Sequence, residues 1–499
     1  MKQYLIGIDV GTSGTKSVLF DIDGAVVASA SAEYPMAQPQ NGWAEQDPDD
    51  WWRAAVSTLR ELTAKATDGE IAGIGLSGQM HSMVLLDAED RVIRPAILWC
   101  DGRTAAECRE IEDIVGRERL IEITANPALP GFTASKIMWV KKHEPQNFAR
   151  CAHILLAKDY IRFKLTGEYA TEVSDASGMQ LLDVPARRWS EEVCNKLGVD
   201  MRLLAKVYES AEVTGRVTAD AAALTGLSVG VPVAGGAGDN AAAAVGMGVC
   251  REGKAFTTIG TSGVVFAHTE QPQIDPQGRI HTFCAAVPGQ WHVMGVTQAA
   301  GLSLNWFRRN LAAELSYADI DRACAGIPIG AEKLIYLPYL MGERTPILDA
   351  DARGVFFGLS AVHTKAHMAR AVLEGVSYSL VSCLDVLREV GISVGDMALC
   401  GGGGKSPFWQ EMLSDMYGVP IKTMASDEGA ALGAAILGGC AAGVYPSVTD
   451  ACDRIVKEKS KTLPDADRHA AYMGGYRIYC GLYPALKDSF RALSEAAYE

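Results

Sequence analysis

The chain has 499 residues, more than one ordinary hydrophobic core supports, so two domains are expected. Its formal net charge of −14 excludes the basic face that nucleic acid or an anionic membrane would need as a partner. The 12 cysteines and 9 histidines are dispersed, so neither a disulfide framework nor a metal cluster is indicated. With no signal peptide and no apolar run long enough to span a bilayer, we expect a cytoplasmic protein.

The first glycine-rich stretch, residues 7–16, joins two apolar runs and predicts a β-hairpin. A plain turn would need only glycine, because glycine adopts positive φ without a steric penalty. This turn also contains an acid, two hydroxyls and a lysine: Asp9, Gly11, Thr12, Ser13 and Lys16. A loop that holds phosphate oxygens and a metal needs such N–H groups, hydroxyls and a carboxylate.

Residues 1–33 are expected to form three strands, followed by a helix over 48–66. Residues 71–81 then contain glycines at 73, 75 and 78, which match a dinucleotide-binding fingerprint in letters. We interpret them as the end of a strand, because a second strand-like run at 83–86 follows where the fingerprint requires a helix. That strand end would bring Gln79, Met80 and His81 to the edge of a cleft.

A second strand, over 96–100, leads into Asp101 and Arg103. Either Asp101 caps the helix over 104–115, or Asp101 and Arg103 together face a hydroxylated ligand. Two or three helices are expected over 131–165. A later strand, over 231–234, leads through Gly238 to Asp239, Asn240 and an alanine-rich helix. Asp239 is either the N-cap of that helix or, facing a cleft, a general base.

Gly260-Thr261-Ser262-Gly263 repeats residues 11–14 letter for letter, again between two strand-like runs. A repeat in the same context near the middle of the chain indicates a duplicated fold. We therefore expect a first domain at 1–245 and a second at 246–455. Residues 456–499 are expected to form two amphipathic helices that pack on the domains.

In the second half, strands are expected near 280–297, 334–337 and 397–400, with helices over 302–313 and 364–390. The strand at 397–400 runs into four glycines and Lys405, which nearly match a P-loop. Leu399 stands where the leading glycine of that motif is required, so this is not a Walker A loop. Four glycines between a strand and a helix still let backbone lie against a planar or anionic ligand.

The hairpin with Asp9, its repeat at 260–263, the Gly-Asp-Asn triplet at 238–240 and the glycines at 401–404 together resemble the FGGY carbohydrate kinases. These kinases belong to the superfamily of actin, hexokinase and the heat-shock chaperone ATPases. Two longer family patterns also match, at 131–140 and at 354–375. The resemblance covers nearly the whole chain. It implies an α/β fold with two ribonuclease-H-like, actin-like ATPase domains around a central cleft.

The resemblance implies an enzyme that transfers phosphate from ATP, with Mg²⁺, to the terminal hydroxyl of a ketopentose. The motifs at 43–48, 79–81, 97–103 and 342–346 favour D-xylulose. Met80 and His81 stand where glycerol kinases of the family have an arginine–glutamate pair, which argues against glycerol. A ribulose or gluconate kinase of the same family and a non-kinase actin-like ATPase stay open as alternatives, as does a homodimer.

The resemblance also implies a role for each motif. Asp9 would hold Mg²⁺ through water, and Asp239 would accept the proton of the attacking hydroxyl. The sugar would be bound by Gln79, Met80, His81, Asp101, Arg103, Asp239 and Asn240. The nucleotide would be bound by Gly11, Thr12, Ser13, Lys16, Gly260, Thr261, Ser262, Gly401, Gly402, Gly403 and Lys405. A structural role is equally open for Lys16.

Overall fold

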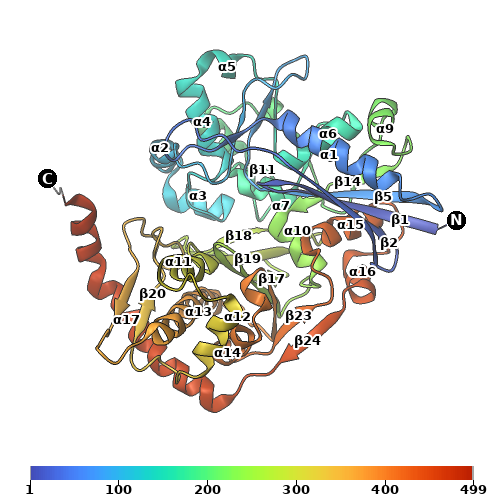
Figure 1. Ribbon diagram of the computed structural model, residues 1–499. Helices are drawn as coiled ribbons and strands as arrows, with labels where there is room; N and C mark the ends of the chain where they lie inside the picture. The colour runs from blue at the N-terminus through green and yellow to red at the C-terminus, as the bar shows by residue number, and fades with distance from the viewer. Residues whose placement is uncertain (1, 497–499) are drawn as a thin grey trace.

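The computed structural model describes residues 2–496, which contain two large sheets (Figure 1). The first sheet has the order β13-β14-β5-β1-β2-β3, and β15 also pairs with β5. Its strands are β1 (Lys2–Val10), β2 (Gly14–Asp21), β3 (Val26–Glu33), β5 (Gly69–Gly78), β13 (Val213–Arg216), β14 (Pro232–Ala234) and β15 (Ala237–Gly238). The first three strands are antiparallel to one another, whereas β5 runs parallel to β1 and β14 runs parallel to β5.

The second sheet repeats this plan in the order β18-β19-β17-β16-β22-β23-β24. Its strands are β16 (Lys254–Ile259), β17 (Gly263–Thr269), β18 (His281–Cys284), β19 (Trp291–Thr297), β22 (Asp396–Cys400), β23 (Ile421–Met424) and β24 (Glu458–Thr462). As β1 does, β16 has antiparallel neighbours on one side and parallel strands on the other. The shared order confirms the duplicated fold that the repeated tetrapeptide predicts.

The helix expected after the first three strands is α1 (Pro48–Thr63), which packs on β2 and β3. Asp47 begins it, because the Asp47 side chain accepts a hydrogen bond from the Asp49 N–H and a proline occupies the first turn. Trp51 and Leu59 lie on its buried face. Local capping and an apolar stripe therefore explain this helix without longer-range contacts.

A helix-rich lobe is inserted between β5 and β13, and its helices α2–α5 lie together at the upper left in Figure 1, to the side of the first sheet. It has an apolar cluster of its own. The helices are α2 (Ala105–Val115), α3 (Arg117–Thr124), α4 (Thr133–His143), α5 (Pro145–Ala149), α6 (Ala157–Thr166), α7 (Val173–Ala176) and α8 (Glu191–Leu197), with α9 (Ala219–Thr225) after β13 and 3₁₀ turns at Ser177–Met179 and Met201–Leu203. The short strands are β4 (Glu45–Gln46), β6 (Val84–Leu86), β7 (Ala96–Ile97), β8 (His153–Leu155), β9 (Ala170–Glu172), β10 (Leu182–Asp183), β11 (Arg188–Trp189) and β12 (Lys206–Tyr208).

Two helices of small residues, α10 (Asp239–Gly246) and α15 (Gly429–Ala441), pack directly against each other between the two sheets. Glycine makes this contact possible. A Cβ atom on Gly246 would lie 1.9 Å from the Gly429 carbonyl oxygen, and one on Gly433 would lie 1.8 Å from the Ala242 carbonyl oxygen. The backbones of the two helices therefore touch without intervening side chains.

Helix α15 also packs on β1 and β5, and α16 (Val448–Ile455) packs on α15. These late elements share one apolar cluster with strands of the first sheet. A single cut near residue 245 therefore does not separate the two cores, because the chain returns to the first sheet after β23. Composition and periodicity do not reveal such a return, since α15 is small and apolar on all sides.

The remaining elements of the second domain are α11 (Gly301–Leu311), α12 (Tyr317–Ala325), β20 (Ile335–Leu337), β21 (Val355–Phe357), α13 (Lys365–Glu389), a 3₁₀ turn at Gly403–Lys405 and α14 (Pro407–Tyr417). They form the largest buried apolar cluster together with the sheet. Helix α13 packs against β19 and β20, as the apolar period over 364–390 predicts. Among the described residues, no helix is long and apolar enough to cross a membrane.

The expectation of two helices over the tail is wrong. The tail contains the edge strand β24 and one long helix, α17 (Ala466–Glu495), which packs on α14. Strand β24 could not be recognised from the sequence, because its residues are polar and an exposed edge strand needs no apolar alternation. Helix α17 continues through Pro484 because Tyr472, Tyr476 and Tyr479 on its first half and Phe490 beyond the proline are buried against the protein.

Candidate active site

The ends of three parallel strands bring the predicted acids to one edge of the first sheet. In the register of these strands, Asp9 of β1 lies beside Ser77 of β5, and Ala237 of β15 lies on the other side of Ser77. Asp239 follows two residues after Ala237, at the start of α10. Ligands of open α/β sheets bind at this carboxyl edge, so the topology itself indicates the site.

Asp9 is half-buried at this edge, and its Oδ1 atom is buried without a hydrogen-bond partner among the described residues. Burial raises the pKa of Asp9 above its ordinary value, which is the direction expected for a carboxylate without a counter-ion. An orphaned, buried carboxylate oxygen fits a cation or its hydration shell. The described residues contain no group of three or more His, Cys, Asp or Glu that would hold a metal by themselves. A Mg²⁺ ion that shares one carboxylate, water and phosphate oxygens is compatible with that donor set.

Asp239 is the first residue of α10, and Gly238 is the N-cap. The alternative that Asp239 itself caps the helix is therefore wrong. Its Oδ1 atom accepts hydrogen bonds from the Asn240 backbone N–H at 2.7 Å and from the Asn240 side chain at 3.0 Å. Burial, together with the negative charge of Asp9, raises the pKa of Asp239 to about 7. A carboxylate with that pKa can accept a proton near neutral pH.

Each Gly-Thr-Ser-Gly loop forms a tight turn, but the two turns are closed differently. The Gly11 N–H donates to the carbonyl of the fourth residue, Gly14, at 3.0 Å, and the Gly260 N–H donates to the carbonyl of the third residue, Ser262, at 3.0 Å. Thr12, Ser13, Thr261 and Ser262 all retain solvent exposure. Their hydroxyls are therefore accessible from the two domains, as a phosphate-binding role requires.

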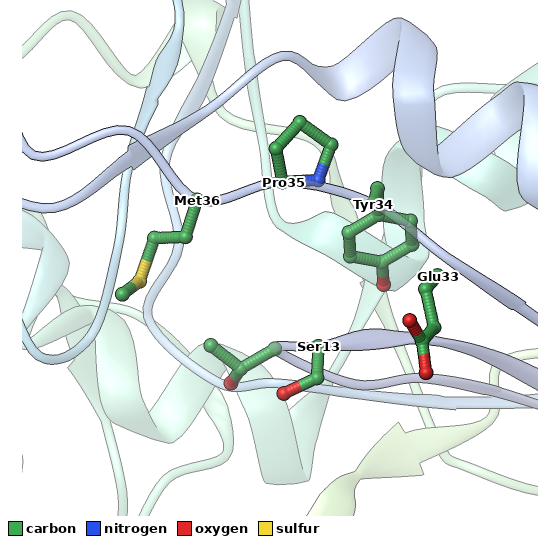
Figure 2. A pocket seen from close by; sticks show the side chains of 6 residues that line it. Ser13, Glu33, Tyr34, Pro35 and Met36 are labelled. Carbon is green, nitrogen blue, oxygen red and sulfur yellow. The ribbon is translucent and has the colours of Figure 1, made fainter.

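A cavity of about 570 Å³ lies beside the first loop (Figure 2). The loop contributes Thr12 and Ser13, and the segment after β3 contributes Tyr34, Pro35 and Met36. Trp99 from the inserted lobe donates its indole N–H to the Thr12 hydroxyl at 3.0 Å. The first loop is thus held from the lobe side and open on the cavity side.

Lys16 pairs with Glu428, just before α15, at 2.5 Å. This ion pair joins β2 to the second half of the chain, which favours the structural alternative for Lys16. At the Gly401–Gly403 loop, Gly401 has φ +82°, and a Cβ on Gly402 would meet no atom within 4 Å. Lys405 is exposed and lies 3.7 Å from Asp427. Nucleotide contacts at these positions stay predictions.

His81 is held by its backbone and by one ring nitrogen. Its Nδ1 atom lies 2.8 Å from the Gly178 carbonyl oxygen, so that nitrogen has the proton and Nε2 is left as an acceptor. Burial and the nearby Lys136 lower the pKa of His81 well below its ordinary value, so the ring is neutral. The His81 ring also packs on Phe132 at 4.7 Å between centroids. A neutral imidazole with a bare Nε2 suits a sugar hydroxyl donor.

Two further residues, to which the sequence analysis assigned no role, lie close to His81. Lys136 is fully buried and donates its ammonium to the His81 carbonyl oxygen at 2.8 Å. Burial lowers the pKa of Lys136 to about 7. Arg344 of the second domain lowers the pKa of His81 through its positive charge. Both residues lie in motifs that the family resemblance rests on, but no spacing rule connects either of them to His81.

Met80 packs against the start of α10. A Cβ atom on Gly238 would lie 2.8 Å from the Met80 side chain, so glycine is needed there for close approach. Gln79 is buried, and its amide lies within hydrogen-bond distance of Gln46 at 3.1 Å and of the Gly11 carbonyl at 3.4 Å. Gln79 therefore supports the first loop, and its contact with sugar stays a prediction.

Asp101 and Arg103 are paired with each other at 2.7 Å and are almost completely buried. Asp101 also accepts the Ala44 backbone N–H at 2.6 Å, whereas the cap of α2 is Thr104. The alternative that Asp101 caps this helix is therefore wrong. Arg103 stacks on Trp43, 3.6 Å from its ring centroid. This arrangement holds the loop rigidly, and direct sugar contacts from Asp101 and Arg103 stay predictions.

The duplicated α/β fold brings two Gly-Thr-Ser-Gly loops and the Asp9 carboxylate together in one two-domain protein. The family model "FGGY family of carbohydrate kinases" matches with its N-terminal domain at residues 4–246 and its C-terminal domain at 255–442. The chain therefore belongs to the FGGY family of carbohydrate kinases, as its motifs predict.

Relatives and solved structures agree with this assignment. The xylulose kinase of Escherichia coli is 41% identical, over 96% of this chain and 99% of that protein. A ligand-bound xylulose kinase from Lactobacillus acidophilus has a TM-score of 0.94 at 30% identity, covering 98% of this chain and 100% of the other. A gluconate kinase from Lactobacillus acidophilus has the same TM-score at 30% identity, with 99% and 100% covered. The chain thus has the expected two-domain α/β fold of sugar kinases.

Proposed function

We propose that the protein phosphorylates the terminal hydroxyl of D-xylulose, giving D-xylulose 5-phosphate, with ATP as the phosphate donor. The observation that supports this best is the carboxyl of Asp239, with a pKa of about 7, on the same sheet edge as Asp9. His81 approaches from the inserted lobe, and hydroxyl-bearing loops come from both domains. The names of the full-length relatives favour xylulose.

In the proposed reaction the sugar is held by Met80 and His81, with the bare Nε2 of His81 accepting one sugar hydroxyl. The terminal hydroxyl lies against Asp239, whose carboxylate takes its proton as the oxygen attacks the γ-phosphorus of ATP. The bond between that phosphorus and the bridging oxygen to the β-phosphate breaks, and ADP leaves. Asn240 orients the carboxylate through its two hydrogen bonds.

The two Gly-Thr-Ser-Gly loops would contact the phosphates of ATP, and the Gly401–Gly403 loop would contact the adenosine. Asp9 would hold Mg²⁺ through water, and when bound this ion neutralises charge on the β- and γ-phosphate oxygens. Positioning and charge stabilisation supply most of the catalysis in phosphoryl transfer. Closure of the two domains about the α10–α15 contact would exclude water from the sugar.

A gluconate kinase is the second candidate, because the solved gluconate kinase is as similar in fold as the xylulose kinase. A coupled assay of ADP release over D-xylulose, D-ribulose, L-ribulose, gluconate, xylitol and glycerol distinguishes them. We expect the highest kcat/KM with D-xylulose and phosphate on its C5 oxygen by NMR. Preference for gluconate, or ATP turnover that no sugar increases, would refute the proposal.

A further inference from the structure

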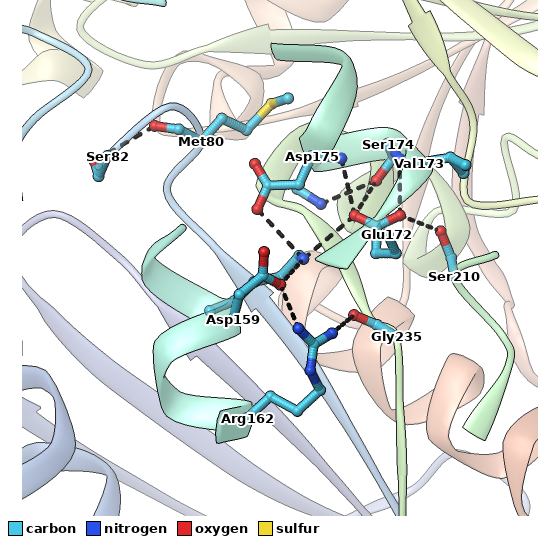
Figure 3. Close-up of polar contacts among 12 residues, drawn as sticks. Met80, Ser82, Asp159, Arg162, Glu172, Val173, Ser174, Asp175, Ser210 and Gly235 are labelled. Carbon is cyan, nitrogen blue, oxygen red and sulfur yellow. Dashed lines mark hydrogen bonds and ion pairs between the residues drawn. The ribbon is translucent and has the colours of Figure 1, made fainter. Parts of the chain in front are cut away.

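A buried group of charged side chains lies near Met80 (Figure 3). It consists of Lys158, Asp159, Arg162, Glu172 and Asp175, each with at most 1% of its side chain exposed. Helix α6 contributes the first three, and the segment around β9 and α7 contributes the last two. Such a group is costly to bury, because each charge loses its hydration. Its place in the fold therefore calls for an explanation beyond stability.

The members of this group are held by ion pairs to one another. Lys158 lies 2.7 Å from Asp159 and 3.4 Å from both Glu172 and Asp175, and Arg162 lies 3.0 Å from Asp159. Burial raises the pKa of the Asp175 carboxyl well above its ordinary value. Two basic and three acidic side chains are thus packed together away from solvent.

Glu172 connects this group to the start of α10 through one serine. Glu172 Oε1 accepts the Ser174 hydroxyl at 2.9 Å, and Ser174 Oγ accepts the Gly238 backbone N–H at 3.1 Å. Gly238 is the N-cap of α10 and immediately precedes Asp239. The other oxygen of Glu172 accepts the Ser210 hydroxyl at 2.6 Å.

Residues 172–178 also hold His81, the proposed sugar ligand, and contact the second domain. Gly178 accepts the Nδ1 hydrogen of His81 at 2.8 Å, and a Cβ on Gly178 would lie 2.3 Å from the His81 ring. Ser177 accepts the backbone N–H of Cys284 in β18 at 3.0 Å. Residues 172–178 thus contact Gly238 beside the proposed base, His81 and the opposite sheet within seven positions.

We propose that Ser174, held by Glu172, is a positioning residue for Asp239, and that residues 172–178 set the distance between Asp239 and His81. Removing the Ser174 hydroxyl takes away the side-chain acceptor of the Gly238 N–H and frees the N-terminus of α10 to shift. Asp239 moves with that terminus, whereas His81 keeps its bond to Gly178. The sugar therefore still binds, but its terminal hydroxyl no longer meets the carboxylate. This proposal rests on the role of Asp239 proposed above.

The test compares Ser174→Ala with Ser210→Ala in the full-length enzyme, on whichever sugar the wild type prefers. Both variants lose a buried hydrogen bond to Glu172, and Ser174→Ala also loses the bond from the Gly238 N–H, so the difference between the two variants isolates the bond to Gly238. We expect Ser174→Ala to lower kcat at least ~10-fold with the sugar KM within twofold, since small misplacements of reacting groups are costly. Ser210→Ala should keep kcat within twofold and lose no more thermal stability than Ser174→Ala.

Ser174→Cys preserves volume and replaces a strong acceptor by a weak one, so it should show the same fall in kcat if the alanine variant does not fold. An unchanged kcat in both Ser174 variants, or equal kcat losses in the two alanine variants, would overturn the proposal. Asp239→Asn is measured in parallel. If that variant turns over normally, the proposed base is wrong; if it is inactive while the Ser174 variants are normal, only the positioning role is wrong.

Discussion

Gly433→Ala tests the contact between α10 and α15, which positions the helix that begins with Asp239. The added Cβ atom would lie 1.8 Å from the Ala242 carbonyl oxygen, whereas ordinary contact begins at 3.4 Å. Backbone forms both sides, so no side chain can rotate away, and the helices must separate by about 1.6 Å. Overpacking of this kind costs about 3 kcal/mol of unfolding free energy.

The same displacement should reach the reaction, because α10 begins at Asp239. A shift of about 1 Å in a reacting group lowers turnover on the order of 100-fold. We therefore expect Gly433→Ala to lower both the urea midpoint, followed by circular dichroism, and kcat in the coupled assay.

Gly429→Ala is the matched control for stability, because it lies one turn away in α15 and a Cβ there would meet no atom within 4 Å. The unfolding free energy of Gly429→Ala should equal or exceed that of the wild type, since alanine is favoured over glycine in helices. If Gly433→Ala matches the wild type in both stability and kcat, then α10 and α15 do not touch as described.

Three further results are expected. Asp239→Asn should retain the sugar KM but lose at least ~100-fold in kcat, the scale of general-base loss, and near-normal turnover would contradict the base role. His81→Ala should raise the KM for sugar more than the KM for ATP, and the reverse would remove His81 from the sugar site. Burial lowers the pKa of His281 and His292 to about 3, so the unfolded chain binds more protons below about pH 6.5 and stability falls as the pH falls towards 3. At pH 5 each histidine costs about 2 kcal/mol, so His292→Phe should reduce the loss of stability between pH 7 and pH 5 by that amount in urea titrations; an unchanged loss would show that His292 is not buried in its neutral form.

Local patterns predicted those parts of the site that depend on backbone shape. The two hairpin loops follow from glycine and hydroxyl residues between apolar runs, and their repetition revealed the duplicated fold. Rejection of the fingerprint at 73–78 was likewise local, because β6 follows β5 where a helix would be required. In each case neighbouring residues alone decide the outcome.

Contacts between distant residues could not be predicted in this way. Arg103 is stacked on Trp43 and paired with Glu45, which are about 60 residues away in sequence, so its spacing from Asp101 alone does not reveal these partners. Lys136 and Ser174 contact His81 and Gly238 from other elements. The return of α15 to the first sheet has the same origin, because only tertiary packing distinguishes one apolar surface from another.

The buried charged group bears on the position of the base rather than on its pKa. Burial and the charge of Asp9 raise the pKa of Asp239, and the hydrogen bonds from Asn240 lower it. None of these causes comes from the charged group. Glu172 instead reaches the start of α10 through the Ser174 hydroxyl and the Gly238 N–H. Position and pKa of the base can then be set separately, the first by Glu172 and Ser174 and the second by burial and Asp9.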